Sequence, residues 1–204
     1  MLHELFDFYN VKTERIVLAS GSPRRSELLR KGGLEDFEVM PVDADETIAP
    51  GTAPHTAVMQ LSGKKALAAR ERCAPGDLII AADTVVSLDG EILGKPGTED
   101  KAREMLKKLS GRSHKVFTGV TLRRGDMEMT DFEETEVFFR EISESEIGAY
   151  IRTGEPLDKA GAYGIQGAAC SFVYRLEGDY YNVMGLPMAK LCTMLKVFGV
   201  EMLK

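Results

Sequence analysis

Residues 18–29 read Leu-Ala-Ser-Gly-Ser-Pro-Arg-Arg-Ser-Glu-Leu-Leu, and they join the end of a strand to the start of a helix. The apolar run from Ile16 to Ala19 predicts the strand. Ser22 and Pro23 are residue types preferred at the N-cap and at the first position of a helix. The helix is expected to end at Gly32-Gly33. We expect the rest of the chain to be organised around this strand, turn and helix.

The first turn of this predicted helix carries two cations, Arg24 and Arg25. The positive end of the helix dipole lies there, so each cation costs about 0.3–1 kcal/mol where an acidic residue would stabilise. Free backbone amides and arginines at a helix N-terminus together form a good receptor for a phosphate chain. The alternative is a capped helix whose arginines point to solvent, and the pattern alone leaves both interpretations open.

The composition indicates a globular protein without a general affinity for polyanions. Of the 204 residues, 44% are hydrophobic and 28% are charged, which is ordinary for one domain with a substantial core. The formal net charge is −6, whereas nucleic-acid binding depends largely on basic surface. We therefore expect no nucleic-acid partner, and any bound phosphate would be held locally.

The cysteines and the N-terminal residues predict a cytoplasmic protein. Cys73, Cys170 and Cys192 are widely spaced and form no Cys-x-x-Cys pair, which favours buried thiols in a reducing compartment. No apolar run is long enough to span a membrane, so no membrane partner is expected, and Met1 to Glu14 lacks the layout of a signal peptide. We expect residues 1–14 to be an added arm and residues 15–204 to form a single domain.

An acidic run, Asp43-Ala44-Asp45-Glu46, follows a short predicted strand at residues 37–41. Three carboxylates in four residues are usually a solvated loop. They are also suitable for a hard divalent cation such as Mg²⁺, which takes oxygen ligands and bridges to phosphates. Which of Asp43, Asp45 and Glu46 would bind the metal is left open.

The next helix, predicted over residues 56–73, places a lysine on its apolar side. Val58, Leu61, Ala68 and Ala69 fall on one face at the helical period, and Lys65 falls among them. A lysine in such a position can extend its ammonium out of the stripe to solvent. The functional interpretation is an ammonium directed into a cleft, where it would meet phosphate.

Residues 78–88 predict a strand that is covered on both faces, because they are apolar almost throughout. Asp83 lies in the middle of this strand. Burying an unpaired carboxylate is so costly that such groups are normally paired, metal-bound or neutralised. Asp83 is therefore a candidate site residue on physical grounds. Asp89-Gly90 predicts a hairpin turn that returns through residues 91–94 to Lys95.

The remaining elements alternate in a way that predicts an α/β fold with a mixed sheet. They are a helix over 99–109 capped by Thr98, strands over 113–123 and 127–140, a helix with a capping box at Ser143 and Glu146, a strand over 171–176 and a helix over 187–198. The acidic residues of the second long strand, Asp131, Glu133, Glu134 and Glu136, indicate an exposed face rather than a metal site.

A glycine-rich loop, residues 154–167, reads Gly-Glu-Pro-Leu-Asp-Lys-Ala-Gly-Ala-Tyr-Gly-Ile-Gln-Gly. Gly161, Gly164 and Gly167 recur at three-residue spacing, which suggests a backbone that approaches a ligand closely. The spacing is not that of the dinucleotide-binding fingerprint. As a bare glycine pattern it is weak evidence.

Three of these segments together resemble the Maf family of nucleoside triphosphate pyrophosphatases, whose name refers to inhibition of septum formation. They are residues 18–29, the block 82–86 with Gly94-Lys95-Pro96, and the loop 154–167. A long ungapped match is far more specific than a lone glycine motif. The resemblance extends from Ile16 to about Gly199. It implies a twisted sheet flanked by helices, with two lobes around a deep cleft, similar to the inosine triphosphate pyrophosphatases.

The resemblance also implies roles for individual residues. Asp83 would be the catalytic carboxylate, and Glu46 and Asp83 would bind Mg²⁺ or Mn²⁺. The residues implied to bind the substrate are Ser20, Arg24, Arg25, Lys65, Thr84, Lys95 and Gln166. In the subgroup similar to dTTP/UTP pyrophosphatases, Gln166 belongs to base recognition, and its amide can both donate to and accept from a pyrimidine edge. Arg24 and Thr84 would help to set specificity.

The expected reaction is metal-assisted hydrolysis of dTTP, UTP and modified pyrimidine nucleotides between the α and β phosphates. Asp83 would act as general base toward water or would hold the metal, and the sequence does not separate these roles. The alternatives are a 7-methyl-GTP pyrophosphatase and a nucleotide-binding regulator of cell division that acts through partners. Neither a P-loop nor a His-Glu-x-x-His zinc motif is present. The resemblance also allows a homodimer.

Overall fold

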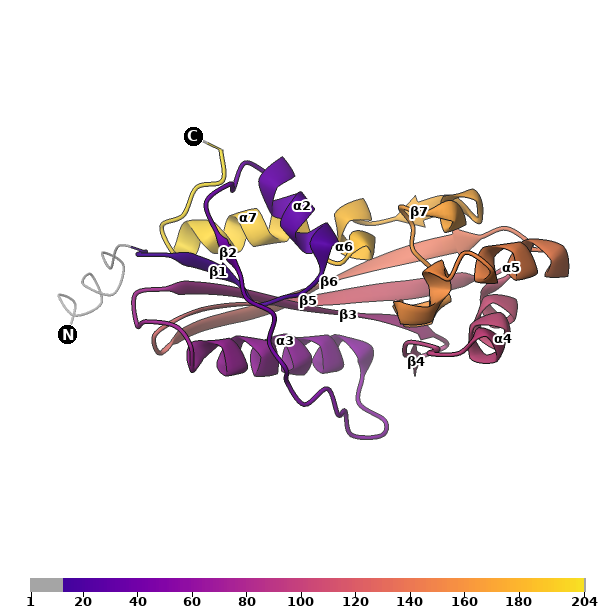
Figure 1. Ribbon diagram of the computed structural model, residues 1–204, viewed down its shortest axis with the longest axis horizontal. Helices are drawn as coiled ribbons and strands as arrows, with labels where there is room; N and C mark the ends of the chain where they lie inside the picture. Colours follow the sequence, from indigo (N-terminus) through magenta and orange to yellow (C-terminus); the bar gives the residue numbers. More distant parts are fainter. Residues whose placement is uncertain (1–12, 204) are drawn as a thin grey trace.

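The computed structural model describes residues 13–203, and the predicted arm at residues 1–14 therefore lies almost entirely outside the described part. The predicted α/β class with a mixed sheet is confirmed (Figure 1). Seven strands form one sheet in the order β2-β1-β3-β5-β6-β7, with β4 paired to β3. Their bounds are Ile16–Leu18 (β1), Glu38–Val39 (β2), Leu78–Leu88 (β3), Glu91–Leu93 (β4), Ser113–Arg124 (β5), Met127–Phe139 (β6) and Val173–Glu177 (β7). Strands β1, β2 and β3 are parallel, and the other pairs are antiparallel.

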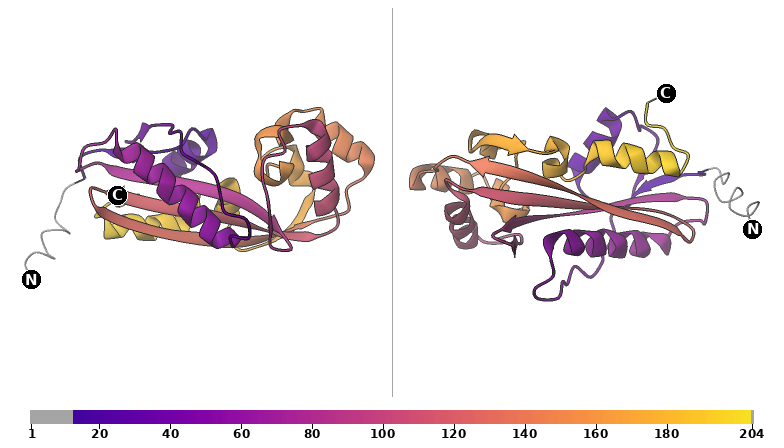
Figure 2. Two further views of the ribbon diagram at one scale, coloured as in Figure 1. Left: turned by 90° about the horizontal axis from the view of Figure 1, so that it is seen from below. Right: turned by 180° about the vertical axis from the view of Figure 1, so that it is seen from behind.

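Helices cover both faces of this sheet. They are α2 (Pro23–Lys31), α3 (Pro54–Arg70), α4 (Glu99–Leu109), α5 (Glu144–Ile151), α6 (Tyr180–Met184) and α7 (Met188–Val197), with short 3-10 turns η1 (Glu155–Asp158), η2 (Ala160–Ala162) and η3 (Ala168–Ser171). Helix α3 lies on one face, and α2, α6 and α7 lie on the other (Figure 1). Helices α4 and α5 gather at one end of the long strands, away from α3, which gives the two lobes that were expected (Figure 2). Among the described residues, no helix combines the length and the apolar character needed to cross a membrane.

The outer edge of β3 is interrupted. Along its inner edge, β3 pairs with β5 from Ile79 to Ser87. On the other edge, β1 pairs only as far as Ile80, and β4 begins only at Val86. Asp83 therefore lies in a stretch of the central strand where no strand of the described part covers one edge.

Local sequence signals account for most element boundaries. Strand β3 and helix α4 have the predicted bounds, and the capping box of Ser143 and Glu146 is formed at the start of α5. Ser22 and Pro23 occupy the predicted N-cap and first position of α2. However, the Ser22 side chain makes no capping hydrogen bond, and its backbone N–H donates instead to Ser20 Oγ at 3.2 Å. Helix α6 is an element that the sequence analysis did not predict.

Helix α3 packs so closely on the sheet that one position of β5 must be glycine. A Cβ at Gly119 would lie 2.3 Å from the carbonyl oxygen of Val58 in α3. Gly119 is also the register partner of Asp83. This close approach brings α3, which carries Lys65, down onto the strand that carries the buried carboxylate.

We expect Gly119→Ala to lower the free energy of unfolding by about 3 kcal/mol, because α3 would have to move away from β5. The matched control is Gly63→Ala within α3, where a Cβ would meet nothing within 4 Å. That change should raise stability by about 0.5–1 kcal/mol, since glycine is a poor helix residue. Urea unfolding of the two variants measures the difference. Equal stabilities would contradict the close packing.

Candidate active site

A cleft of about 700 Å³ opens at the interrupted edge of β3. One side is formed by the N-terminal end of α2, the loop around Glu46, and α3. The other side is formed by the segment after β4 and the loop 155–167, and residues of α6 also line the cleft. The cleft is lined by Arg24, Arg25, Glu46, Lys65, Asp83, Thr84, Lys95 and Gln166. These are all the predicted site residues except Ser20.

The cleft carries more positive than negative side chains although the whole chain has a net charge of −6. The cations are Arg24, Arg25, Lys65, Lys95 and Lys159, and the carboxylates are Glu46, Asp83, Glu155 and Asp158. Lys65 and Lys159 form ion pairs with carboxylates of the cleft. Among the described residues, Arg24, Arg25 and Lys95 have no carboxylate within ion-pair distance. The site is therefore prepared for an anion of several charges.

Arg25 is held by neutral acceptors only. Its guanidinium donates to the carbonyl oxygen of Gly185 at 2.8 Å, to Ser20 Oγ at 3.0 Å and to Thr84 Oγ1 at 3.2 Å. Burial lowers the pKa of Arg25, and the nearby carboxylate of Asp83 acts in the opposite direction. Arginine nevertheless stays protonated in proteins, so a half-buried positive charge without an ion-pair partner among the described residues lines the cleft. Ser20 contributes to the site by fixing Arg25.

A chain of hydrogen bonds fixes the position of Thr84 and Gly185. Thr84 Oγ1 is 2.9 Å from Thr118 Oγ1, and Thr118 donates to the carbonyl oxygen of Asn182 at 2.9 Å. The Asn182 amide donates to Val116 O at 3.0 Å and to Thr135 Oγ1 at 2.9 Å. Asn182 is completely buried and belongs to α6. The short helix α6 thus positions Gly185, the residue that follows it and whose carbonyl binds Arg25, and the sequence did not predict this role.

On the opposite face of β3, one lysine joins two carboxylates. Lys65 Nζ contacts Asp83 Oδ1 directly and lies 2.8 Å from Glu46 Oε1. The Lys65 and Asp83 side chains are only 14% and 12% exposed. The hydrogen bond from Lys65 lowers the pKa of Glu46. The side chain of Lys65 therefore does not extend to bulk solvent, and its ammonium lies in the cleft as the functional interpretation requires.

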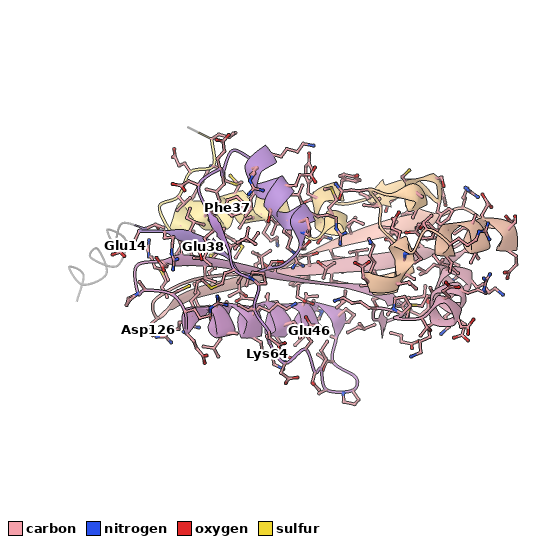
Figure 3. The ribbon with its side chains drawn as sticks, viewed as in Figure 1. Glu14, Phe37, Glu38, Glu46, Lys64 and Asp126 are labelled. Atoms are coloured by element: carbon pink, nitrogen blue, oxygen red, sulfur yellow. The ribbon has the colours of Figure 1, made fainter. Side chains whose placement is uncertain are left out.

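The structure distinguishes the three acidic residues of the loop at 43–46. Glu46 lines the cleft, whereas Asp45 accepts from the backbone N–H of Thr47 at 2.9 Å and pairs with Lys64. Hydrogen bonds from Thr47 are the main cause that lowers the pKa of Asp45 to about 2. Asp43 is exposed and does not line the cleft. Figure 3 shows Glu46 and Lys64 beside α3. Of the three, only Glu46 lines the cleft together with Asp83.

The second lobe contributes Lys95 and Gln166, both of them exposed. Two backbone hydrogen bonds tie the segment after β4 to the loop 155–167: Gly161 N–H donates to Gly94 O at 3.2 Å, and Gly97 N–H donates to Leu157 O at 3.2 Å. Lys95 and Gln166 are thereby parts of one connected unit. Glu155, Asp158 and Lys159 of this loop also line the cleft, although no pattern in the sequence predicted a role for them.

Arg24 and Asp158 line the same cleft from different lobes. The hydrogen bond from Lys159 is the main cause that lowers the pKa of Asp158, and the charge of Arg24 contributes to the same shift. Arg24 belongs to α2 and Asp158 to η1. A ligand that fills the cleft would therefore contact both lobes.

A buried histidine supports the wall of the cleft behind Tyr163. His114 Nε2 lies 2.8 Å from the hydroxyl of Tyr163, and the His114 ring packs edge-on against Phe139 and Tyr163. Among the described residues, His114 Nδ1 has no hydrogen-bond partner. Burial lowers the pKa of His114 to about 4, so the imidazole is neutral at pH 7. Its role is to hold Tyr163, which lines the cleft.

Comparison with known proteins assigns the family. The model of the family described as Maf-like protein matches residues 15–198. The chain belongs to the Maf family. Among its relatives in that family, a protein of Bacillus cereus named dTTP/UTP pyrophosphatase is 46% identical over 98% of this chain and 97% of its own length. A protein of the same name from Bacillus thuringiensis subsp. konkukian is 46% identical over 92% of this Maf-family chain and 97% of its own length.

A solved structure of a HAM1 protein from Coxiella burnetii also matches this Maf-family chain. It is 14% identical, covers 89% of this chain and 98% of the other, and has a TM-score of 0.49.

The neutral state of His114 predicts a pH dependence of stability. A folded-state pKa near 4, below the ordinary value of 6.5, means that only the unfolded chain binds this proton as the pH falls. The contribution of His114 to stability is complete above pH 6.5 and is lost toward pH 4, by about 3 kcal/mol in total. Urea unfolding of wild type and His114→Gln at several pH values tests this. As the pH falls from 6.5 to 4, the free energy of unfolding of the variant should rise by about 3 kcal/mol relative to that of wild type. A difference that does not depend on pH would contradict the assignment of a neutral His114.

Proposed function

We propose that this chain is a nucleoside triphosphate pyrophosphatase that hydrolyses dTTP and UTP, and modified pyrimidine nucleotides of the same shape, to the monophosphate and pyrophosphate. The observation that carries the proposal is the position of Asp83, a buried carboxylate that is paired with Lys65 and shares one cleft with cations that have no carboxylate partner among the described residues. The names of relatives that are 46% identical over nearly the whole chain support the choice of substrates.

The triphosphate is bound by the cations on both sides of the cleft. Arg24 and Arg25 approach it from α2, and Lys95 approaches it from the second lobe. Arg25 is already held by Ser20, Thr84 and Gly185, so it needs little reorganisation when the charge of the departing pyrophosphate develops. Preorganised donors of this kind stabilise the transition state more than the free substrate.

Asp83 accepts the proton of the attacking water in this proposal. The water oxygen forms a bond to phosphorus as the anhydride bond between the α and β phosphates breaks, and pyrophosphate leaves. Lys65 holds the Asp83 carboxylate at the edge of the cleft and balances its charge before the substrate binds. Because Lys65 also pairs with Glu46, it holds the carboxylates of Glu46 and Asp83 close to each other.

The carboxylates fit a divalent cation, Mg²⁺ or Mn²⁺. Glu46 and Asp83 converge on one point, where the Lys65 ammonium lies. Among residues 13–203, no cluster of three or more potential ligands occurs. Two carboxylates are nevertheless enough for Mg²⁺, which keeps several waters and takes phosphate oxygens as further ligands. Such an ion, held by Glu46 and Asp83, would supply Lewis-acid stabilisation of the phosphate charge.

We assign base recognition to Gln166, which belongs to the loop 155–167 of the second lobe and lines the cleft. Its amide offers both a donor and an acceptor to a pyrimidine edge. A preference for 7-methyl-GTP would overturn this assignment but leave the chemistry unchanged. Binding of nucleotides without turnover would favour a regulator of cell division that acts through partners.

The domain organisation, location and partners of the protein complete the proposal. We propose a single domain over residues 15–204 in the cytoplasm, without nucleic-acid or membrane partners, and the net charge of −6 supports the absence of a nucleic-acid partner. A homodimer is proposed from the family resemblance, and light scattering of the purified protein tests it. A monomeric mass would exclude it.

We expect Asp83→Asn to lower the rate of pyrophosphate release from dTTP by about 100-fold or more, because the variant has no group to accept the proton. Release of pyrophosphate with Mg²⁺ or Mn²⁺ measures the rate. Asp126→Asn is the matched control, since Asp126 is exposed and lies at the end of the molecule away from Glu46 (Figure 3). It should keep normal activity. Normal turnover by Asp83→Asn would show that the catalytic assignment is wrong.

We expect Glu46→Gln to raise the Mn²⁺ concentration needed for half-maximal activity by about tenfold, because one of the two carboxylates is lost. Removal of metal with EDTA should abolish turnover, and added Mg²⁺ or Mn²⁺ should restore it. Asp45→Asn is the control, since Asp45 pairs with Lys64 outside the cleft. An identical metal requirement in wild type and Glu46→Gln would exclude Glu46 as a ligand.

A further inference from the structure

Two side chains of the second lobe hold the turn that carries Gln166 from both of its ends. The hydroxyl of Tyr150 accepts from the backbone N–H of Gly164 at 3.1 Å. The carboxylate of Glu155 accepts from the backbone N–H of Ala168 through Oε2 at 3.2 Å. Gln166 lies midway between these two backbone positions. The turn itself is closed by Gly167 N–H, which donates to Gly164 O at 3.0 Å.

The two supporting side chains are also bonded to each other. Tyr150 donates its hydroxyl proton to Glu155 Oε1 at 2.9 Å. Tyr150 is only 3% exposed, and its ring packs edge-on against Phe172. Burial raises the pKa of Tyr150, so the hydroxyl keeps the proton that it donates. Tyr150 and Glu155 thus form one rigid support that begins in α5 and ends at the turn.

Two of the three regularly spaced glycines of the loop lie against this support. A Cβ at Gly167 would lie 2.1 Å from Glu155 Oε1, and a Cβ at Gly164 would lie 2.9 Å from the same oxygen. A Cβ at Gly161 would instead lie 2.9 Å from the side chain of Val86. The spacing of the three glycines predicts a backbone that approaches a ligand closely. The close approaches that the structure shows are to side chains of the protein itself.

The Glu155 carboxylate has an unusual set of partners for a charged group at the edge of a cleft full of cations. It accepts from a phenol and a backbone amide, while the Lys159 ammonium binds the backbone carbonyl of Glu155 and the carboxylate of Asp158. A carboxylate that only balanced charge would be expected to pair with the lysine. The bonds of Glu155 are instead directed at the turn.

We propose that Glu155 and Tyr150 are positioning residues for base recognition, acting through Gln166 and not through contact with the substrate. The inference rests on the proposed function, because it concerns how the same cleft selects its base. An exposed glutamine side chain has many rotamers, and motion of its backbone would add further conformations. Selectivity for the base therefore depends on a fixed turn. Phosphate binding and the reaction at Asp83 do not pass through this support.

The experiment uses Tyr150→Phe, which removes one hydroxyl and keeps the ring against Phe172. Tyr174→Phe is the matched control, since Tyr174 is 67% exposed on β7 and lies outside the cleft. Glu155→Ala and the conservative Glu155→Gln complete the set. The readout is discrimination, defined as kcat/KM for the preferred triphosphate divided by that for the poorest of dTTP, UTP, CTP, GTP and 7-methyl-GTP.

We expect Tyr150→Phe and Glu155→Ala to lower discrimination by about tenfold, through KM and with kcat changed less than about twofold. Glu155→Gln should regain most of the loss, because its amide oxygen can still accept from Ala168 and its NH₂ can donate to Tyr150. In a Gln166→Ala background, neither change should have a further effect, since Gln166 would no longer respond to its support. Additive losses would overturn the proposal, because they would mean that Glu155 or Tyr150 acts on the substrate independently of Gln166.

Hydrogen exchange of the backbone amides gives a second readout that needs no turnover. The Gly164 and Ala168 amides should exchange at least about tenfold faster in Tyr150→Phe and Glu155→Ala than in wild type and Tyr174→Phe. Unchanged exchange, or faster exchange with full discrimination, would overturn the positioning role. Failure of the proposed function is a different result: wild type would then release no pyrophosphate from any triphosphate, and discrimination measured as nucleotide affinity by calorimetry would replace the kinetic ratio.

Discussion

The outer edge of β3 has no strand partner between Ile80 and Val86 in the described part of the chain, and the arrangement of the site depends on this interruption. Successive side chains of a strand point to opposite faces of a sheet. Asp83 faces α3 and Thr84 faces α2 and α6, as their contacts with Lys65 and Arg25 show. A complete sheet would separate these groups. Because the edge is open, cations from both faces line one cleft.

Charge balance then determines which charged side chains of the cleft are paired with each other and which are available to bind a ligand. Asp83 lies in a strand whose other residues are nearly all buried and apolar, so an uncompensated carboxylate there would be very costly. Lys65 compensates it within the resting protein. Arg25 donates hydrogen bonds only to neutral acceptors, so its charge is left for a ligand. An acidic protein thus obtains a local site for a polyanion without a basic surface.

Strand and helix boundaries were predictable where the signal lies within a few residues. The apolar run of β3, the caps of α4 and the capping box of α5 each depend on local hydrogen bonding and periodicity, and all three are formed as predicted. Helix α6 was not predicted, since its five residues are too few for a period to be visible. Its position depends on Asn182, whose partners Val116 and Thr135 are distant in the sequence.

The sequence by itself determined the α/β class, the family and the residue types available for the site, because these follow from patterns within short segments. It also singled out Asp83, since a carboxylate in an apolar strand conflicts with its surroundings whatever the partner. Only the tertiary structure decided the partners. It joined Lys65 to Asp83 and Glu46, assigned Ser20 to Arg25, and placed the Glu155 carboxylate beneath the turn of Gln166. Such contacts depend on distances across the sheet and between the lobes, and no local pattern contains that information.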